Sequence, residues 1–317
     1  MTSRSSRPAA LVATALALAA CSSAPTAPAV VTASPEYRQA YDVALDAYVY
    51  GLPLLTTDAT FRTMTSVDVP QGAFGPVNHV NNVRSPNSAS STAVVAPGAT
   101  SLSSIAWLDL TDGPQVLHVP EVTGHFFVLA LLDPYTENVV NLGTASGTEP
   151  GDYVIATRDQ SQDAVPSGAH RIEVDYSRIW IIGSTQLKGA SDVAAVNAIQ
   201  DGYTLRPLNP STPAPPTATA TAVTAYQPAT GIGYFDELGA LLEQFPPPSA
   251  DSPALARFAT VGIGPGRTPS TDDSLSDSAR QALADAVAAG PAQIQADVKS
   301  LYSQDFSAHA GYLLGGF

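Results

Sequence analysis

The sequence predicts an α+β fold, mainly β, in which an antiparallel β-sandwich or barrel is flanked by helices and followed by a helical C-terminal part. Between about residues 92 and 187, short runs rich in Val, Ile and aromatic residues are separated by Gly, Pro, Asp or Ser. Regular spacing of this kind, without long helical stretches, favours antiparallel strands over a parallel sheet. From about residue 233 the apolar residues instead recur every three or four positions, which indicates helices.

The N-terminus has the pattern of a lipoprotein signal peptide over residues 1–20. Arg4 and Arg7 precede an apolar run too short to span a membrane, and the run ends in the lipobox Leu-Ala-Ala-Cys. Cys21 is the single cysteine of the chain. We therefore expect cleavage before Cys21, lipidation of its thiol with palmitate among the acyl chains, and anchoring of the exported protein on the outer side of the cytoplasmic membrane. An ordinary secretory signal with an incidental cysteine is the alternative.

Residues 21–35 are small and Pro-rich, which predicts a tether between the lipid and the folded body.

The composition of the chain excludes some classes of partner. Without Arg4 and Arg7 the chain has 12 basic and 28 acidic residues, a net charge of −16, which argues against nucleic acid as a partner. No dinucleotide fingerprint, phosphate-binding loop, serine-hydrolase elbow or zinc-protease motif occurs, so we expect no cofactor. The expected partners are the bilayer, reached through Cys21, and a small polar ligand or an envelope protein.

The first helix of the body is predicted over residues 35–52. Ser34 suits the N-cap, and Pro35 suits the first helical position. A stripe of tyrosines and leucines follows at helical spacing and stops at Gly51 and Pro53, where we expect the helix to end. This stripe can line a pocket or pack against a sheet, and packing is the interpretation that we favour.

Eight strands are predicted within a mainly antiparallel β domain that spans residues 36–205. They are TAVVAP (92–97), SIAWLDL (104–110), QVLHVPEV (115–122), HFFVLALLD (125–133), NVVNLG (138–143), DYVIAT (152–157), HRIEVD (170–175) and RIWIIGS (178–184). The fourth run is apolar on both faces, so we expect it in the interior of a sheet. Thr123-Gly124 predicts a hairpin turn between the third and fourth strands.

The chain after the strands is predicted to be helical apart from one connection. Ser191 is expected to cap a short helix that ends near Tyr203. Residues 206–232, rich in Pro, Thr and Ala, predict an extended connection. The C-terminal part, residues 233–317, is expected to pack on the β domain. Its predicted helices span residues 234–245, 254–261, about 273–289 and about 292–303, and Gly290-Pro291 separates the last two.

Nine short segments occur in a characteristic order along the chain. They are YVYGLPLL (48–55), GPVNHV (75–80), AWLDLTDGP (106–114), LLDPYTENV (131–139), GDYVI (151–155), RIWIIGSTQ (178–186), IQDGY (199–203), YFDEL (234–238) and GIGPG (262–266). Together they resemble the bacterial domain-of-unknown-function 1254 family over about residues 36–305. The resemblance implies a β-sandwich, often in an exported protein, and no reaction is established for the family. Members commonly carry a companion β-jelly-roll, domain of unknown function 1214, which we expect this chain to lack.

One motif of the family is altered in this sequence. Similar proteins carry Pro-Asn-x-Asp-Thr-Leu-Tyr-Ser before the Ala-Trp-Leu-Asp-Leu strand, and residues 97–104 match it with PGATSLSS. Gly98, Thr100 and Ser103 stand in place of the Asn, Asp and Tyr, so a carboxylate and a phenol that can ligate a cation or move a proton are absent. Either this chain has lost a site, or the motif serves only to cap a turn.

Two polar segments supply candidates for ligand binding. In GPVNHVNNVR, amides can read hydroxyl groups and a guanidinium can grip an anion, whereas in LLDPYTEN polar residues follow a buried strand, a common position for sites. Self-satisfying turns are the alternative for both segments. The candidate ligand-binding residues are Asn78, Arg84, Asp133, Tyr135 and Asn138. We expect any ligand to be held by these two segments together and not by residues 97–104.

Catalytic and metal-binding candidates are fewer. Asp133 and Glu137 can act as a general acid and base if their pKa values diverge, although an Asx-turn at Asp133-Pro134 explains the same residues. His118, Glu121 and His125 are close in sequence, but a hairpin would keep them from converging, so we expect no metal site.

Two classes of function remain. The first, which we favour, is a membrane-anchored envelope lipoprotein that binds a small polar ligand or another envelope component without catalysis. The second is a hydrolase-like or lyase-like enzyme that uses the carboxylates at the end of strand 126–133. Both carboxylates facing an open pocket would favour the enzyme, and turn bonds that occupy both would favour binding.

Overall fold

The computed structural model describes residues 33–86, 100–160, 165–209 and 221–303, with side chains up to residue 300. Cys21, the signal peptide of residues 1–20, most of the tether and the strand predicted at 92–97 lie outside the described residues. The compact unit described below begins at Ser34. Within the described ranges, no helix combines the length and the apolar character that a membrane span requires.

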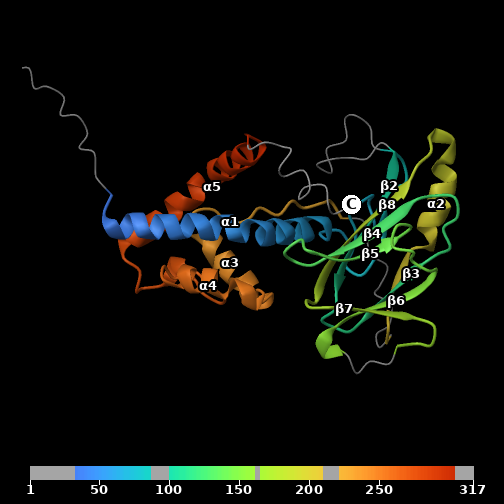
Figure 1. The fold of residues 1–317 in the computed structure, drawn as a ribbon, viewed down its shortest axis with the longest axis horizontal. Helices are drawn as coiled ribbons and strands as arrows, with labels where there is room; N and C mark the ends of the chain where they lie inside the picture. Colours follow the sequence, from blue (N-terminus) through green and yellow to red (C-terminus); the bar gives the residue numbers. More distant parts are fainter. Residues whose placement is uncertain (1–32, 87–99, 161–164, 210–220, 304–317) are drawn as a thin grey trace, which may run out of the picture. The chain divides into compact units, whose positions relative to one another are not determined.

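The described residues form a helical part and a β part. The helices are α1 (Pro35–Met64), α2 (Val193–Gly202), α3 (Gly233–Gln244), α4 (Ser252–Ala259) and α5 (Asp277–Ser303). The strands are β1 (Asn81–Asn82), β2 (Ser101–Asp109), β3 (Gln115–Val119), β4 (Phe127–Leu132), β5 (Asn138–Gly143), β6 (Gly151–Thr157), β7 (His170–Val174), β8 (Arg178–Gln186) and β9 (Thr204–Pro207). The helical part comprises α1, α3, α4 and α5, and the β part comprises the strands with α2 (Figure 1).

The strands form two sheets that pack face to face. One sheet has the order β1-β2-β8-β4-β5 and the other the order β7-β6-β3-β9. Alternate residues of β2, β4 and β8 point inward and share one core with inward residues of β3 and β6, as in a sandwich. The α+β class with mostly antiparallel sheets is therefore confirmed, and the two sheets do not close into a barrel. Strand β4 lies in the interior of its sheet, as its doubly apolar sequence predicts.

The sheet topology corrects two expectations. The hairpin predicted at Thr123-Gly124 is wrong, because β3 pairs with β6 and β9 whereas β4 pairs with β8 and β5. The chain instead crosses from one sheet to the other there, after Pro120 and through Gly124, whose φ of 72° suits glycine. The β6–β7 pair is parallel, an exception to the antiparallel pairing expected for the β-sandwich.

Helix α1 begins where the sequence predicts but is longer. The Ser34 hydroxyl accepts a hydrogen bond from the Tyr37 backbone N–H at 3.0 Å, as an N-cap should. The helix does not end at residue 52; it continues through Pro53 to Met64. Residues on both sides of Pro53 are buried, Leu54 at 1% exposure among them, so packing outweighs the backbone hydrogen bond that proline removes.

Helix α5 also continues through an internal proline. It runs without a break through Gly290-Pro291, where two separate helices were expected. A Cβ atom at Gly290 would lie 2.2 Å from Cε1 of Tyr48, so the glycine allows α1 and α5 to approach closely. A Cβ atom at Gly51 would similarly lie 2.7 Å from the Leu238 side chain, where α1 crosses α3. The tyrosine and leucine stripe of α1 therefore packs against helices rather than against a sheet.

Two smaller differences concern the chain between β8 and α3. Ser191 lies in a 3-10 turn before α2 and makes no capping hydrogen bond, because α2 begins at Val193. The connection predicted to begin at residue 206 starts with the end of β9, which pairs with β3. Further along, residues 221–226 are held against the end of α1, where the Tyr226 N–H donates to the Thr63 hydroxyl at 3.0 Å.

Candidate functional site

Asn78, the first candidate for ligand binding, is engaged with the end of strand β2. Its side-chain NH2 group donates to the Asp109 carbonyl at 3.0 Å, and its side-chain oxygen accepts from the Asp109 N–H at 2.9 Å. Its backbone N–H donates to the Trp107 carbonyl at 2.7 Å. With a φ of 59°, Asn78 adopts a left-handed conformation that asparagine tolerates better than most residues. The Asn78 side chain thus pairs with the Asp109 backbone in the way that a neighbouring strand would.

Arg84, the second candidate, is engaged with helix α2. Its guanidinium forms an ion pair with Asp201 and donates to the Asn197 carbonyl at 3.2 Å. The buried Gln200 side chain accepts from the same guanidinium and donates to the Ser103 carbonyl at 3.0 Å. A cationic side chain that binds carbonyl groups near the C-terminal end of a helix is a common and stabilising arrangement. Arg84 therefore joins α2 to the first strands of the sheet.

Asp133 forms an Asx-turn after strand β4. One carboxylate oxygen accepts from the Tyr135 N–H at 2.8 Å and from the Glu137 N–H at 3.0 Å. Burial raises the pKa of the Asp133 carboxyl above its ordinary value, although the two backbone hydrogen bonds oppose the shift. Glu137 is exposed, and the Asn138 side-chain NH2 group donates to the Asn141 side-chain oxygen at 2.9 Å.

Tyr135, the remaining candidate, joins the β part to the helical part. Its hydroxyl donates to the Phe245 carbonyl at 2.6 Å, and the Tyr176 hydroxyl donates to the Pro246 carbonyl at 2.9 Å. The two tyrosine rings lie 5.7 Å apart. Burial raises the pKa of both phenols, that of Tyr176 to about 12, so both stay protonated and keep donating over the physiological pH range.

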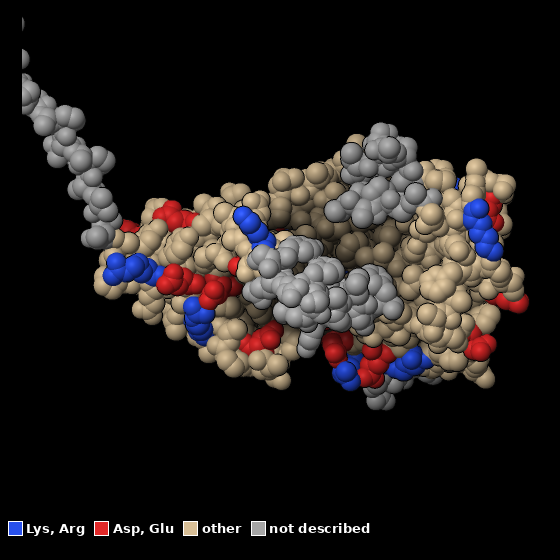
Figure 2. All heavy atoms as spheres, turned by 45° about the horizontal axis from the view of Figure 1, so that its top comes forward, with Lys and Arg blue, Asp and Glu red and all other residues tan. Residues whose placement is uncertain are grey.

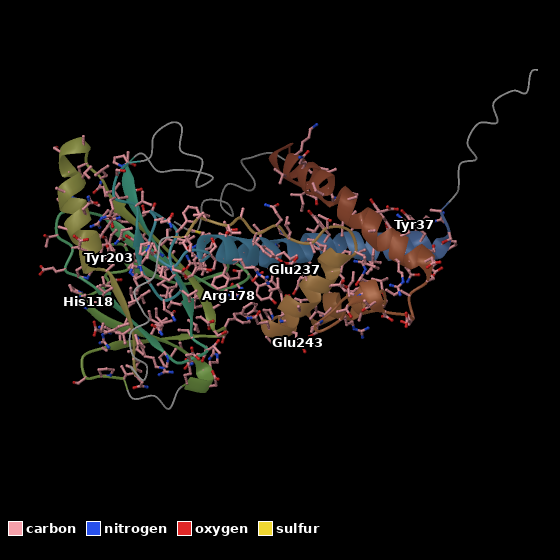
Figure 3. The ribbon with its side chains drawn as sticks, turned by 180° about the vertical axis from the view of Figure 1, so that it is seen from behind. Tyr37, His118, Arg178, Tyr203, Glu237 and Glu243 are labelled. Atoms are coloured by element: carbon pink, nitrogen blue, oxygen red, sulfur yellow. The ribbon has the colours of Figure 1, made fainter. Side chains whose placement is uncertain are left out.

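Beside these tyrosines, Arg178 forms a buried ion pair with α1 (Figure 3). Its guanidinium lies 2.6 Å from one oxygen of Asp58, whose side chain is 1% exposed, and Arg62 contacts the other oxygen at 2.6 Å. The same guanidinium lies over the rings of Phe61 and Phe245 at 3.9 and 4.8 Å from their centroids. The contacts that follow the end of β4 and begin at the start of β8 therefore join the helical part to the β part.

The histidines near the crossover each have a carboxylate partner of their own. His118 Nδ1 lies 2.7 Å from Asp152, which also binds Arg206, whereas His125 Nε2 lies 3.0 Å from Asp192. Their ring nitrogens therefore belong to separate pairs, and Glu121 is exposed. Among the residues that the structure places, no three His, Cys, Asp or Glu side chains form a group suited to a metal ion.

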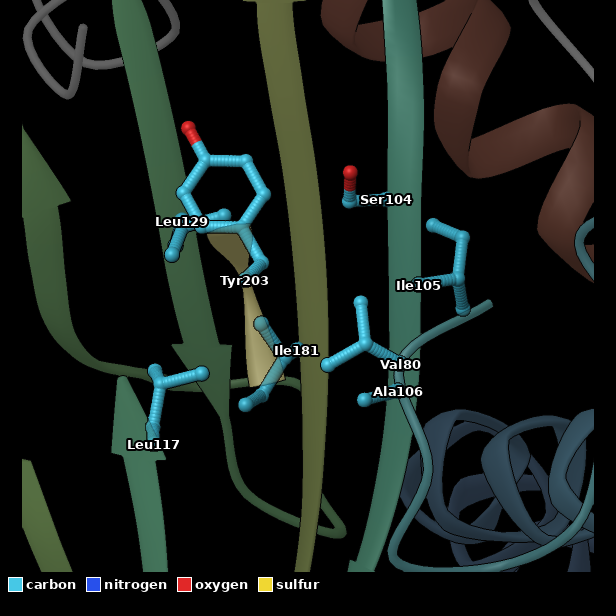
Figure 4. A pocket seen from close by; sticks show the side chains of 8 residues that line it. All are labelled: Val80, Ser104, Ile105, Ala106, Leu117, Leu129, Ile181 and Tyr203. Carbon is cyan, nitrogen blue, oxygen red and sulfur yellow. The ribbon is translucent and has the colours of Figure 1, made fainter. Parts of the chain in front are cut away.

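The interior of the sandwich contains a small cavity (Figure 4). It has a volume of about 10 Å³, and its lining consists mainly of aliphatic side chains with Ser104 and Tyr203. This volume is close to the space that one water molecule needs, so the cavity is too small for a metabolite.

A larger groove of about 290 Å³ lies on the outer face of the five-stranded sheet. Its lining comprises Thr100, Ser101, Phe126, Val128, Ser184 and Gln186. The Phe126 side chain is 47% exposed, an unusual state for a large aromatic residue. Its backbone N–H donates to the Gln186 side-chain oxygen at 3.3 Å, and its carbonyl accepts from the Gln186 N–H at 2.8 Å. None of the six lining side chains is charged.

The sequence contains one signal for this groove. In a strand, two adjacent aromatic residues cannot both face the core, so the Phe126-Phe127 pair predicts one outward ring. Phe127 faces the core at 5% exposure and Phe126 faces outward. The groove also includes Thr100 and Ser101, within the altered motif of residues 97–104, whose first three residues lie outside the described ranges. The binding roles of Asn78, Arg84, Asp133, Tyr135 and Asn138 remain predictions.

Charged side chains do not form one broad field on the face shown in Figure 2. Acidic and basic residues lie side by side in small groups there. Ion pairs on the protein surface include those of Arg158 with Glu173 and Asp175. Paired surface charges of this kind steer a charged partner weakly.

The region that carries the strands, residues 77–207, matches the model of a protein family of unknown function, DUF1254. This match includes β1 to β9 and α2, and it confirms the resemblance noted in the sequence. The family description assigns no activity to the DUF1254 region.

The chain is also similar to a solved structure, that of the VPA0106 protein from Vibrio parahaemolyticus. The TM-score is 0.59 and the sequence identity 18%, over 80% of this chain and 58% of that one. The chain thus spans little more than half the length of the VPA0106 protein, and at this identity the likeness concerns the fold alone. A comparison with curated proteins gives no match.

Proposed function

We propose that this protein is an envelope lipoprotein that binds a small uncharged ligand without catalysis, in the groove on the outer face of the five-stranded sheet. The observation that carries the proposal is the half-exposed Phe126 among neutral hydroxyl and amide side chains. Binding sites commonly combine an apolar surface with a few polar groups that orient the ligand. The polar residues that sequence reasoning selected have partners within the protein, which leaves the groove as the better supported site.

The anchoring part of the proposal rests on the lipobox alone. Mass spectrometry of the mature N-terminus should show diacylglycerol and an acyl chain on Cys21. The variant Cys21→Ser should move the protein from the membrane fraction to the soluble fraction. An unmodified N-terminus at any other residue would show that the signal is an ordinary secretory one.

One observation favours the second class, an enzyme of the hydrolase or lyase type. Burial raises the pKa of Asp133, as in carboxyl groups that act as general acids. Against it, one oxygen of Asp133 is already used by two backbone N–H groups, and Glu137 is exposed. Neither carboxylate lines the interior cavity or the groove. Binding without catalysis therefore has the stronger support.

The groove can be tested with the full-length protein purified from membranes. Saturation-transfer NMR against a fragment set of neutral, cationic and anionic compounds should detect binding of neutral compounds. The variant Phe126→Ser should abolish the signal. The matched control Val298→Ser removes another exposed apolar side chain, 44% exposed on α5, and should leave binding unchanged. Fragment binding that is indifferent to Phe126→Ser would place the site elsewhere and refute the proposal.

A further inference from the structure

We infer that the ligand of the groove is a neutral sugar unit of an envelope glycan, an inference that rests on the proposed binding function. The register of three neighbouring strands brings the lining residues together. Ser101 of β2 pairs with Gln186 of β8, and Ser184 of β8 pairs with Val128 of β4. Residues 184 and 186 point to the same face of the sheet because side chains alternate along a strand. Ser101, Val128, Ser184 and Gln186 are therefore held on one surface by strands, and Thr100 and Phe126 immediately precede β2 and β4.

The Phe126 ring supplies an apolar platform on that surface. A pyranose ring has one face of C–H groups and a rim of hydroxyl groups, so it can stack on an aromatic ring and form hydrogen bonds at its edge. The backbone of Phe126 is held through both of its polar groups, which bind Gln186. A ring on a fixed backbone has only two side-chain torsions to order, so a ligand that stacks on it costs little conformational entropy.

The groups around Phe126 match the rim of a sugar. The hydroxyls of Thr100, Ser101 and Ser184 can each donate and accept hydrogen bonds, as sugar hydroxyls do. The Gln186 side-chain oxygen accepts from the Phe126 N–H, so its NH2 group is the end that can donate to a ligand. Neutral donors and acceptors in this arrangement suit a polyhydroxylated molecule.

The same lining disfavours other classes of ligand. A charged ligand would lose part of its hydration without meeting an opposite charge, since none of the described residues that line the groove is Asp, Glu, Lys, Arg or His. A wholly apolar ligand would cover four polar side chains without giving them partners. A volume of about 290 Å³ lies at the lower end of ligand sites, which fits one or two sugar units better than an acyl chain.

The test uses full-length protein and methyl glycosides as probes. Neutral hexose and N-acetylhexosamine glycosides are titrated beside a uronic acid glycoside and a neutral tetrapeptide amide. We expect the neutral glycosides alone to bind, with saturation strongest at the C–H protons of one ring face. Phe126→Ser should weaken their binding by about tenfold or more, since stacking contributes on this order. Gln186→Ala should weaken it several-fold, and Val298→Ser should leave it unchanged.

The outcomes separate this inference from the function on which it rests. If the peptide or the uronic acid binds through Phe126 and the neutral glycosides do not, the sugar assignment is wrong and the groove remains a binding site. If glycosides bind equally well to wild type and Phe126→Ser, the groove is not their site and the sugar assignment to it fails. If no probe or fragment depends on Phe126, both proposals fail together.

Discussion

At the scale of single residues, asparagine and aspartate explain why chemistry was expected where the structure has turns. Asn78 and Asp133 bind backbone groups close to strand ends, and both do so with side-chain atoms that would also suit a ligand. Short polar side chains favour this role because they reach the backbone without losing many rotamers. A polar cluster in a sequence therefore points as readily to a turn as to a site.

The variant Asn78→Ala separates these two roles. It removes both side-chain hydrogen bonds to Asp109 and leaves a residue with a Cβ atom at a φ of 59°. We expect the free energy of unfolding to fall by about 1–3 kcal/mol, measured by chemical denaturation. Asn78→Gly should cost less, because glycine tolerates that conformation. Unchanged stability with loss of ligand binding would instead assign Asn78 to a site.

The Asp58–Arg178 pair provides a second prediction. Arg178→Met keeps the length of the side chain but leaves the Asp58 carboxylate, 1% exposed, with Arg62 as its remaining partner. Leaving a buried charge without any partner costs about 3–5 kcal/mol, and we expect a smaller loss in the free energy of unfolding here because Arg62 still pairs with Asp58. The double variant Asp58→Leu, Arg178→Met should be more stable than Arg178→Met alone. A double variant with additive losses would show that the two side chains do not interact.

At the scale of elements, local signals predicted where helices begin better than where they end. The cap at Ser34 needs only neighbouring residues, so it is visible in the sequence. The continuation of α1 and α5 through Pro53 and Pro291 depends on buried contacts with other helices, which the sequence does not display. The positions of most strands were predictable from their alternation. Their assignment to two sheets was not, because the turn at Thr123-Gly124 looks the same in a hairpin and in a crossover.

The groove was only partly predictable for the same reason. The outward ring of Phe126 follows from the Phe126-Phe127 pair and the period of a strand. Its association with Ser101 and Ser184 depends on the register of β2, β8 and β4, which joins residues far apart in the sequence.

Two glycine variants test how tightly the long helices cross. Gly290→Ala improves helix propensity by about 1 kcal/mol, yet its Cβ atom would lie 2.2 Å from the Tyr48 ring. We expect a net loss of stability, seen as a lower thermal midpoint. The matched control is Gly233→Ala in α3, whose Cβ atom would meet Ala229 at an ordinary 3.5 Å and should be neutral or stabilising. Equal effects of the two changes would mean that the α1–α5 crossing relaxes easily.

At the scale of the whole molecule, tyrosine hydroxyls connect elements that are distant in sequence. The tyrosines with raised pKa values are Tyr37, Tyr48, Tyr50, Tyr135, Tyr153, Tyr176, Tyr203, Tyr226 and Tyr234. For Tyr37 the main cause is the hydrogen bond to Asp285, which takes its pKa to about 12. For Tyr176, also about 12, burial is the main cause.

These shifts predict unfolding in alkali. A phenol whose pKa is raised in the folded state holds its proton more tightly there than in the unfolded chain, where the pKa is about 10. Its contribution to stability is therefore complete below about pH 10 and is lost as the pH rises toward about 12. We expect the free energy of unfolding to fall steeply across this interval, together with the appearance of tyrosinate absorbance. Tyr176→Phe should make the fall shallower, and a flat profile across the interval would contradict the prediction.

The helical part has a consequence for how the chain reaches its native state, because its members are separated in sequence by the entire β part. Helix α1 ends at residue 64, and the helices that cover its apolar face begin at residue 233. Contacts between residues that are so far apart in the sequence form slowly, since the intervening chain must close into a loop before they can form. A β-sandwich that condenses first would shorten the effective loop and bring the two ends near one another. During synthesis, α1 emerges long before its partners, so its leucines and tyrosines stay exposed and open to aggregation until residues 233–286 arrive.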